Sequence, residues 1–181
     1  MDNELANRFF NNVNWFNNFF HDLKTLLDKI TSEIEGYDKK VYYYFKANDI
    51  PAIPQIYYVL LGSDELLNLN LSVVLDKEFV TNPLIPINEP VICVVLHTYE
   101  KHDTTWITRN ILQDKYLKEI KDSNGLISGI IDWGTDYPEI QFYSFTVSLS
   151  LFTEYSEAIV KEKIVDKVNE IQEQHDELVD E

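Results

Sequence analysis

The stretch "VICVVLH", residues 91–97, decides the fold class. Six successive apolar residues precede His97, and most of them are the branched types that favour strands. A strand that is apolar at every position has both faces buried, so we expect this one in the middle of a sheet. The other segments are then interpreted as neighbouring strands and as helices that cover them.

Further strands are expected on both sides of this central one. Some segments are rich in aromatic and branched residues and end at Asn, Asp, Pro or Gly. Others alternate apolar and polar side chains, which is the pattern of a strand with one buried face. The predicted strands are residues 40–47, 56–62, 67–75, 126–131 and 143–151.

The N-terminal segment is predicted to be one long amphipathic helix. Its apolar residues recur at spacings of three and four from Leu5 to Ile34, and Gly36 is placed to end the helix. A helix of about 30 residues is about 45 Å long, so its apolar stripe needs an equally long cover. That cover is the protein's own sheet, a second copy in a homodimer, or another partner.

Two further helices are expected. Residues 107–121 show helical spacing, and the pattern returns from about Thr153 through Val160 to Ile171. The acidic end, residues 171–181, loses its apolar stripe and is predicted to fray. The order of elements indicates a single α+β domain over residues 1–181, with a mainly antiparallel sheet of about five or six strands. We expect the long terminal helices to pack mostly on one face of that sheet.

The net charge of the chain limits the kinds of partner that it can bind. The chain has 15 basic and 31 acidic residues, a formal net charge of −16. Nucleic acids and anionic membranes repel such a chain, and no basic cluster offsets the repulsion. A basic protein partner would be attracted, although negative charge also serves solubility alone. No run approaches the roughly 18 apolar residues of a membrane span, and the start lacks a signal peptide's basic region, so we expect a cytoplasmic protein.

The most motif-like stretch is "GLISGIIDWGTDYPEIQFYSF", residues 125–145. Its first part resembles the segment of aminoglycoside-phosphotransferase-like small-molecule kinases in which an aspartate after a strand, often followed by tryptophan, binds magnesium. Upstream, "HDTTWITRNIL" at 102–112 resembles the catalytic loop of that family. The resemblance implies Asp103 as the catalytic base and Asn110 and Asp132 as magnesium ligands.

Other features of the sequence favour a plain turn over a kinase site. Asp103 and Asn110 are seven positions apart where the general kinase pattern has five, and no glycine-rich phosphate loop precedes them. Asp132, Gly134 and Pro138 are residue types that suit a connection between two strands. We therefore interpret residues 132–138 as a hairpin connection.

Four side chains are candidate ligands of a metal ion: His97, His102, Asp103 and Asp132. Two histidines and a carboxylate can bind zinc or iron, but their spacing here matches no compact metal motif. The alternative is a hydrogen-bonded histidine at the end of a strand, followed by solvated loop residues. We favour that alternative and predict no cofactor.

Aromatic residues make up 13% of the chain. Because successive side chains of a strand point to opposite faces, Tyr42 and Tyr44 are expected on one face and Tyr43 and Phe45 on the other. Such residues fill a core, line a pocket for a small aromatic ligand, or bind a partner, where Tyr and Trp bury area and keep a polar tip. The candidate partner-binding residues are Tyr42, Tyr44, Trp106, Trp133 and Tyr137.

Together these observations favour a non-enzymatic binding protein, immunity- or adaptor-like, that engages a protein partner through an aromatic surface. The alternatives are a metal-dependent enzyme that uses the histidines and aspartates above, and a small-molecule sensor with a pocket between sheet and helix. No Gly-x-Ser-x-Gly nucleophile motif is present. The lone Cys93 lies in the apolar run and is interpreted as an inert core thiol.

Overall fold

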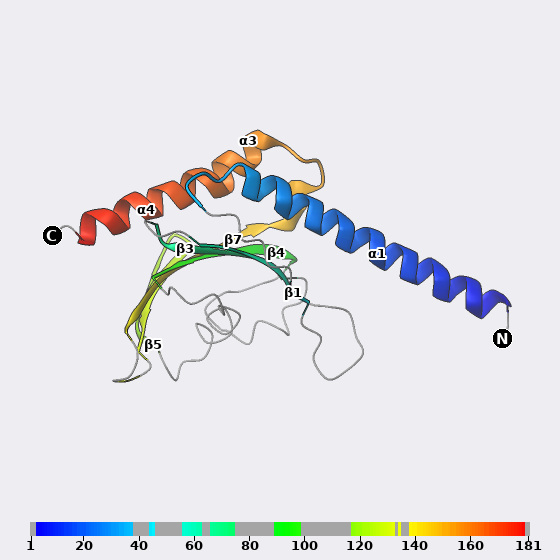
Figure 1. Ribbon diagram of the computed structural model, residues 1–181, viewed down its shortest axis with the longest axis horizontal. Coiled ribbons are helices and arrows are strands. Elements are labelled where there is room, and N and C mark those ends of the chain that lie inside the picture. Colours follow the sequence, from blue (N-terminus) through cyan, green and yellow to red (C-terminus); the bar gives the residue numbers. More distant parts are fainter. Residues whose placement is uncertain are drawn as a thin grey trace.

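The computed structural model describes residues 3–37, 44–45, 56–62, 66–74, 89–98, 117–132, 134 and 138–179. These residues form one antiparallel sheet with helices, which confirms the predicted α+β class within a single domain (Figure 1). The helical elements are α1 (Asn3–Ser32), the 3₁₀ turn η3 (Leu149–Phe152), α3 (Glu157–Val160), the π-helical turn η4 (Lys161–Val165) and α4 (Asp166–Val179). The strands are β1 (Tyr44–Phe45), β2 (Ile56–Leu61), β3 (Asn68–Val74), β4 (Val91–His97), β5 (Leu117–Ser123), β6 (Leu126–Ile131) and β7 (Ile140–Ser148).

The sheet has the strand order β1-β2-β3-β4-β7-β6-β5, and every neighbouring pair is antiparallel. This gives seven strands where the sequence predicted five or six. β4 is the middle strand, and all seven of its residues are buried, as its apolar run predicted. The two ends of the order are β1 and β5, so the sheet is open.

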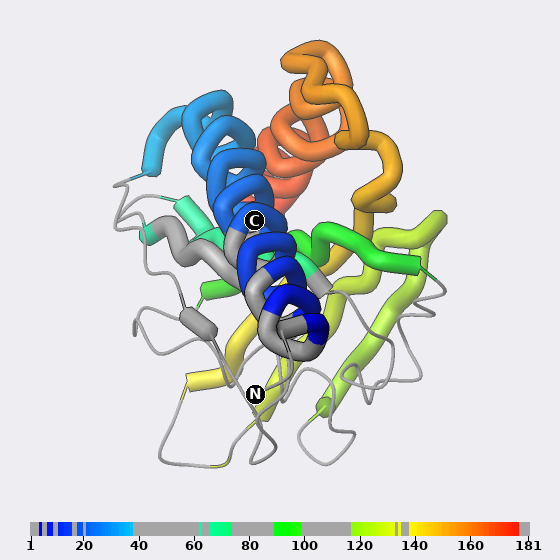
Figure 2. The backbone as a smooth tube through the Cα atoms, turned by 90° about the vertical axis from the view of Figure 1, so that its right-hand side faces the viewer, coloured from blue at the N-terminus to red at the C-terminus, as the bar shows by residue number. Residues whose placement is uncertain are grey.

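Strand register divides the sheet into two faces. Val94 of β4 pairs with Leu71 of β3 and with Phe145 of β7, and paired residues share a face. This row belongs to the core that also contains buried residues of α1, η4 and α4. Figures 1 and 2 show α1 and the C-terminal helices lying on this same face of the curved sheet.

Among the side chains of α1 that the structure describes, the fully buried ones begin at Leu23 and lie under the C-terminal helices and against the sheet. Leu23, Leu27 and Ile30 are at most 4% exposed, and each such burial contributes about 1.5–3 kcal/mol. Nearer the N-terminus, Val13 is 39% exposed and Trp15 is 65% exposed. In Figure 1 the N-terminal half of α1 projects beyond the ends of the strands. The sequence periodicity therefore identified the apolar face but not the extent of its cover.

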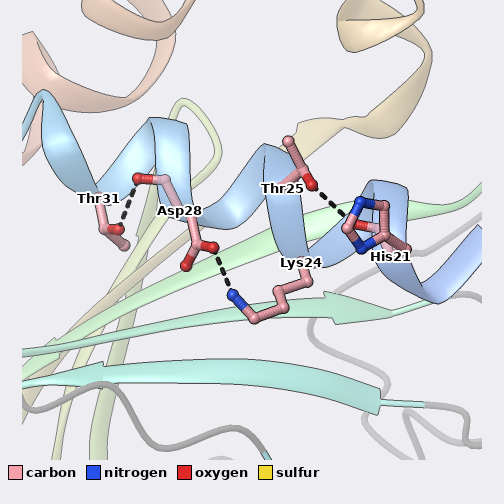
Figure 3. A network of polar contacts seen from close by, with 5 residues as sticks. All are labelled: His21, Lys24, Thr25, Asp28 and Thr31. Atoms are coloured by element: carbon pink, nitrogen blue, oxygen red, sulfur yellow. Dashed lines mark hydrogen bonds and ion pairs between the residues drawn. The ribbon is translucent and has the colours of Figure 1, made fainter.

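The polar side of α1 is stabilised within the helix itself (Figure 3). Lys24 Nζ donates to Asp28 Oδ2 at 2.6 Å, one turn along the exposed surface. The hydroxyls of Thr25 and Thr31 donate to the carbonyl oxygens of His21 and Asp28, at 2.8 and 3.0 Å. These contacts place the side chains of Lys24 and Asp28 on a solvated side of the helix, as the charged residues there suggest.

Residues 107–121 were expected to be helical, and this is wrong for their C-terminal part. Leu117–Ser123 is the edge strand β5, which pairs with β6 through a turn at Asn124 and Gly125. Both turn residues have positive φ, 53° and 82°, which is the tight hairpin geometry favoured by Asn-Gly. β5 is exposed except at Leu117, so the alternation that reveals a half-buried strand is missing. The remainder of that range, residues 107–116, lies outside the described part of the chain.

The C-terminal helix does not fray at residue 171, where the sequence led us to expect it. α4 continues to Val179, and Ile171 and Gln172 are buried. The side chain of Gln172 accepts from the backbone N–H of Leu67 at 3.1 Å and donates to the hydroxyl of Tyr37 at 2.5 Å. Tyr37 in turn donates to the carbonyl of Leu67 at 2.9 Å. This buried network ties α4 to the start of β3 and to the chain that leaves α1.

Candidate functional site

His97 lies at the end of β4, on the face of the sheet opposite the helices. It is 1% exposed, and burial lowers the pKa of its imidazole to about 4. In the register it lies between Asn68 of β3 and Phe142 of β7. At neutral pH the ring is therefore neutral.

The face that His97 occupies is polar yet buried. Asn70 and Ser72 of β3 are 2% and 1% exposed, although their alternation with leucines predicted a solvated face. Ser72 pairs with Cys93, whose Sγ lies 3.7 Å from the Oγ of Ser144 on β7. Burial raises the pKa of the Cys93 thiol, more than the two serine hydroxyls lower it. A protonated, buried thiol is a poor nucleophile.

Asp132 follows β6 and is exposed. Its Oδ1 accepts a hydrogen bond from the backbone N–H of Gly134 at 2.8 Å, and Gly134 has a φ of 95°. Because β6 and β7 are antiparallel neighbours, residues 132–139 connect adjacent strands, as the turn interpretation predicted. His97 is two strands away from β6 and offset by three residues, which puts the Cα atoms about 14 Å apart at ordinary strand spacings. The structure does not bring His97 and Asp132 together.

Of the other predicted site residues, the structure describes only the backbone of Tyr44. His102, Asp103 and Asn110 lie outside the described residues, and so do Tyr42, Trp106, Trp133 and Tyr137. The backbone of Tyr44 is in β1, opposite Tyr58 of β2. Within the described ranges, no group of three or more His, Cys, Asp or Glu side chains could hold a metal ion.

A groove lies between α4 and the β5–β6–β7 end of the sheet, on the helix-bearing face. It has a volume of about 600 Å³. Its charged lining residues are Glu119 and Lys121 of β5 and Lys167 and Glu170 of α4, and its lining also includes Ile130 and Tyr143. A groove of this size fits one or two side chains of a bound peptide, or a small molecule.

Close packing of the strands shapes the bottom of the groove. At Gly129 an added Cβ would lie 2.4 Å from the carbonyl oxygen of Glu119 and 2.9 Å from the ring of Phe142. The absence of a side chain lets β5 approach β6 and lets Phe142 pack beneath them. Tyr143, the next residue along β7, points to the opposite face of the sheet from Phe142, and its hydroxyl lies 3.4 Å from Nδ1 of His175 on α4. The ring of Phe145 lies 5.2 Å from Nζ of Lys167, within reach of a cation–π interaction.

Two of the charged groups that line the groove form an ion pair. The pairing of Glu119 with Lys121 lowers the pKa of the carboxyl group and raises that of the amine. The pKa of Glu119 moves further below 7 and the pKa of Lys121 moves further above 7. A general acid or base works best with a pKa near the operating pH. Beyond Glu170, α4 carries three more exposed acids, and its last turn has no basic residue. The negative end of the helix dipole adds to this acidic field.

The sequence contained no compact signal for this groove. Its lining residues are spread from Glu119 to Gln174, and they meet only because β7 lies between β4 and β6. The acidic run of α4 was visible, but it was interpreted as a frayed tail. The one local indication was Gly129, an isolated glycine within a strand pattern, which often marks a close backbone approach.

Comparison with protein-family models, with curated proteins and with solved structures finds no match to this chain. Among the helices of the described residues, none is long and apolar enough to cross a membrane.

Proposed function

We propose that this protein is a non-enzymatic binding protein that holds a basic protein partner, in the manner of an acidic adaptor or immunity protein. The observation that carries the proposal is the groove beside α4, which combines aromatic and aliphatic lining residues with the carboxylates of Glu119 and Glu170 and the amines of Lys121 and Lys167. An apolar anchor residue of the partner would lie against Tyr143 and Ile130. Basic residues next to the anchor would lie close to Glu170 and the acidic end of α4.

The charge of the whole chain supports a basic partner. A net charge of −16 attracts basic proteins over distances of about 8–10 Å at physiological salt and accelerates their encounter. Specific contacts are still required, because charge alone gives little affinity. The groove supplies the apolar contacts that a purely electrostatic encounter lacks.

Defined peptides test the proposal. Titration calorimetry would compare a Lys/Arg-flanked tryptophan peptide with an acid-flanked one and with a basic peptide that lacks the aromatic residue. We expect only the first to bind, and its affinity should fall as salt increases. Ser128→Trp, which fills the groove, should weaken binding at least about tenfold.

A matched charge change separates the groove from general acidity. Glu170→Lys should weaken binding of the basic peptide, whereas Glu154→Lys, the same change at an exposed position outside the groove lining, should have little effect. Equal losses in both variants would contradict the proposal, as would binding that ignores salt or the aromatic anchor. Circular dichroism of each variant establishes that the fold is retained.

A further inference from the structure

We propose that the N-terminal half of α1 is a self-association surface, on which two copies of the chain pair antiparallel about a two-fold axis at Trp15. This surface is separate from the groove and goes beyond the proposed binding function. It rests on the exposure of α1, on the distribution of charge along the sequence, and on the spacing of three residues.

Where the helix leaves the core, its described surface exposes two apolar side chains, Val13 and Trp15, among uncharged asparagines. Trp15 is 65% exposed, and its ring stacks on Phe19 with centroids 5.4 Å apart and planes 6° apart. Phe19 is itself partly buried against the core, so the aromatic surface continues directly from the folded body. An exposed tryptophan held rigidly by stacking is the kind of residue that dominates the energy of protein interfaces.

The same flank of α1 contacts the chain's own residues farther along. Lys29, two heptads after Trp15, lies with Nζ 4.5 Å from the centroid of the Tyr155 ring. Asp22, one heptad after Trp15, is exposed. The contact with Tyr155 is thus made two heptads beyond Trp15, which is itself 65% exposed.

Electrostatics identify the occupant. Two copies that each carry −16 repel one another over most of their surfaces. Residues 5–21 contain no aspartate or glutamate and a single basic residue, Arg8, in a chain with 31 acids. This is the longest acid-free run of the sequence, so it is the place where two copies approach at the lowest electrostatic cost. A basic partner would find nothing there to attract it.

The charges that flank Trp15 are self-complementary. Arg8, Trp15 and Asp22 are spaced by seven residues, so they lie along one flank of the helix. Arg8 and Asp22 are both exposed, and neither forms an ion pair with other described residues. In an antiparallel pair centred on Trp15, Arg8 of each copy lies opposite Asp22 of the other. A two-fold interface requires such reciprocal matching of one surface with itself.

Sedimentation equilibrium of the full chain tests the proposal. We expect a species of twice the 21.3 kDa chain mass that dissociates on dilution. Trp15→Ala should raise the dissociation constant at least about tenfold. Because Trp15 is largely exposed, the substitution should leave the far-ultraviolet circular dichroism unchanged. A monomer at every concentration, or a dimer unaffected by Trp15→Ala, would overturn the proposal. A chain that stays monomeric but captures another protein would equally contradict the proposal that a second copy binds this surface.

Charge reversal tests the antiparallel arrangement. Arg8→Asp alone and Asp22→Arg alone should each weaken the dimer, because each places like charges opposite one another. The double variant should recover most of the wild-type affinity. Lys161→Asp, an equal charge change at an exposed residue of η4, should have a smaller effect than Arg8→Asp. Failure of the double variant to recover affinity would reject pairing about Trp15.

Discussion

His97 is buried on the polar face of the sheet, where its imidazole is neutral at physiological pH. An unfolded chain has a histidine pKa of about 6.5, whereas burial lowers that of His97 to about 4. Between these two values the unfolded chain binds a proton that the folded chain does not. Stability must therefore fall as the pH drops through this window, and the contribution of His97 to the fall is complete below about pH 4.

His97→Gln removes this titration and keeps a polar side chain at the position. From about pH 7 to about pH 5, wild type should lose about 2 kcal/mol more unfolding free energy than the variant loses. Urea unfolding at both pH values measures this difference. Any constant cost of the substitution cancels, because each protein is compared with itself. If both proteins lose the same unfolding free energy, the folded chain binds a proton at His97 as readily as the unfolded chain does. Its pKa would then not be lowered by burial.

At the scale of elements, the network around Gln172 joins three segments that are far apart in sequence. Gln172→Leu would leave the N–H of Leu67 and the hydroxyl of Tyr37 with fewer partners in a buried place. Unsatisfied buried groups of this kind cost about 1–3 kcal/mol in total. Thermal or urea unfolding should show this loss. Gln174→Leu, the same change at an exposed position of α4, should stay within about 0.5 kcal/mol of wild type, and similar effects in both would contradict the assignment.

Local patterns predicted those elements whose burial follows from their own sequence. The apolar run of β4 predicted a central strand. Gly36 was predicted to end the N-terminal helix and has a φ of 83°, but α1 ends four residues earlier, at Ser32. β5 was missed because an edge strand with nearly every side chain in water shows no alternation. The burial of Gln172 was missed for a different reason. A polar residue gives no sign that partners 105 and 135 residues away along the chain will enclose it.

The two proposed binding surfaces differ in how far the sequence could have anticipated them. The apolar face of α1 was visible from its periodicity, but periodicity does not show that Leu23 is buried while Val13 and Trp15 are exposed. The groove was not visible, because a site built from β5, β6, β7 and α4 depends on the strand order. The histidine and aspartate candidates show the opposite problem. His97 and Asp132 looked related along the chain, yet the register separates them.

At the scale of the whole molecule, a net charge of −16 has a cost in stability. Like charges on a compact body repel, and unfolding relieves that repulsion by spreading them out. Salt screens the repulsion, since the Debye length falls from about 30 Å at 0.01 M to about 8 Å at 0.15 M. The melting temperature should therefore rise with salt over this range, most steeply at its lower end, whereas binding of a basic partner should weaken over the same range.

Neutralising acids on α4 should separate these two effects. Replacing Glu173, Asp176 and Glu177, all exposed, with their amides removes three negative charges without changing shape. The triple variant should melt at a higher temperature than wild type in low salt and show a shallower rise with added salt, and it should bind the basic peptide more weakly. Scanning calorimetry at several salt concentrations measures the first two effects. If the melting temperature of the wild type stays constant or falls as salt is added, repulsion among the acidic side chains does not destabilise the folded state. That result would contradict the expected stability cost of the acidic surface.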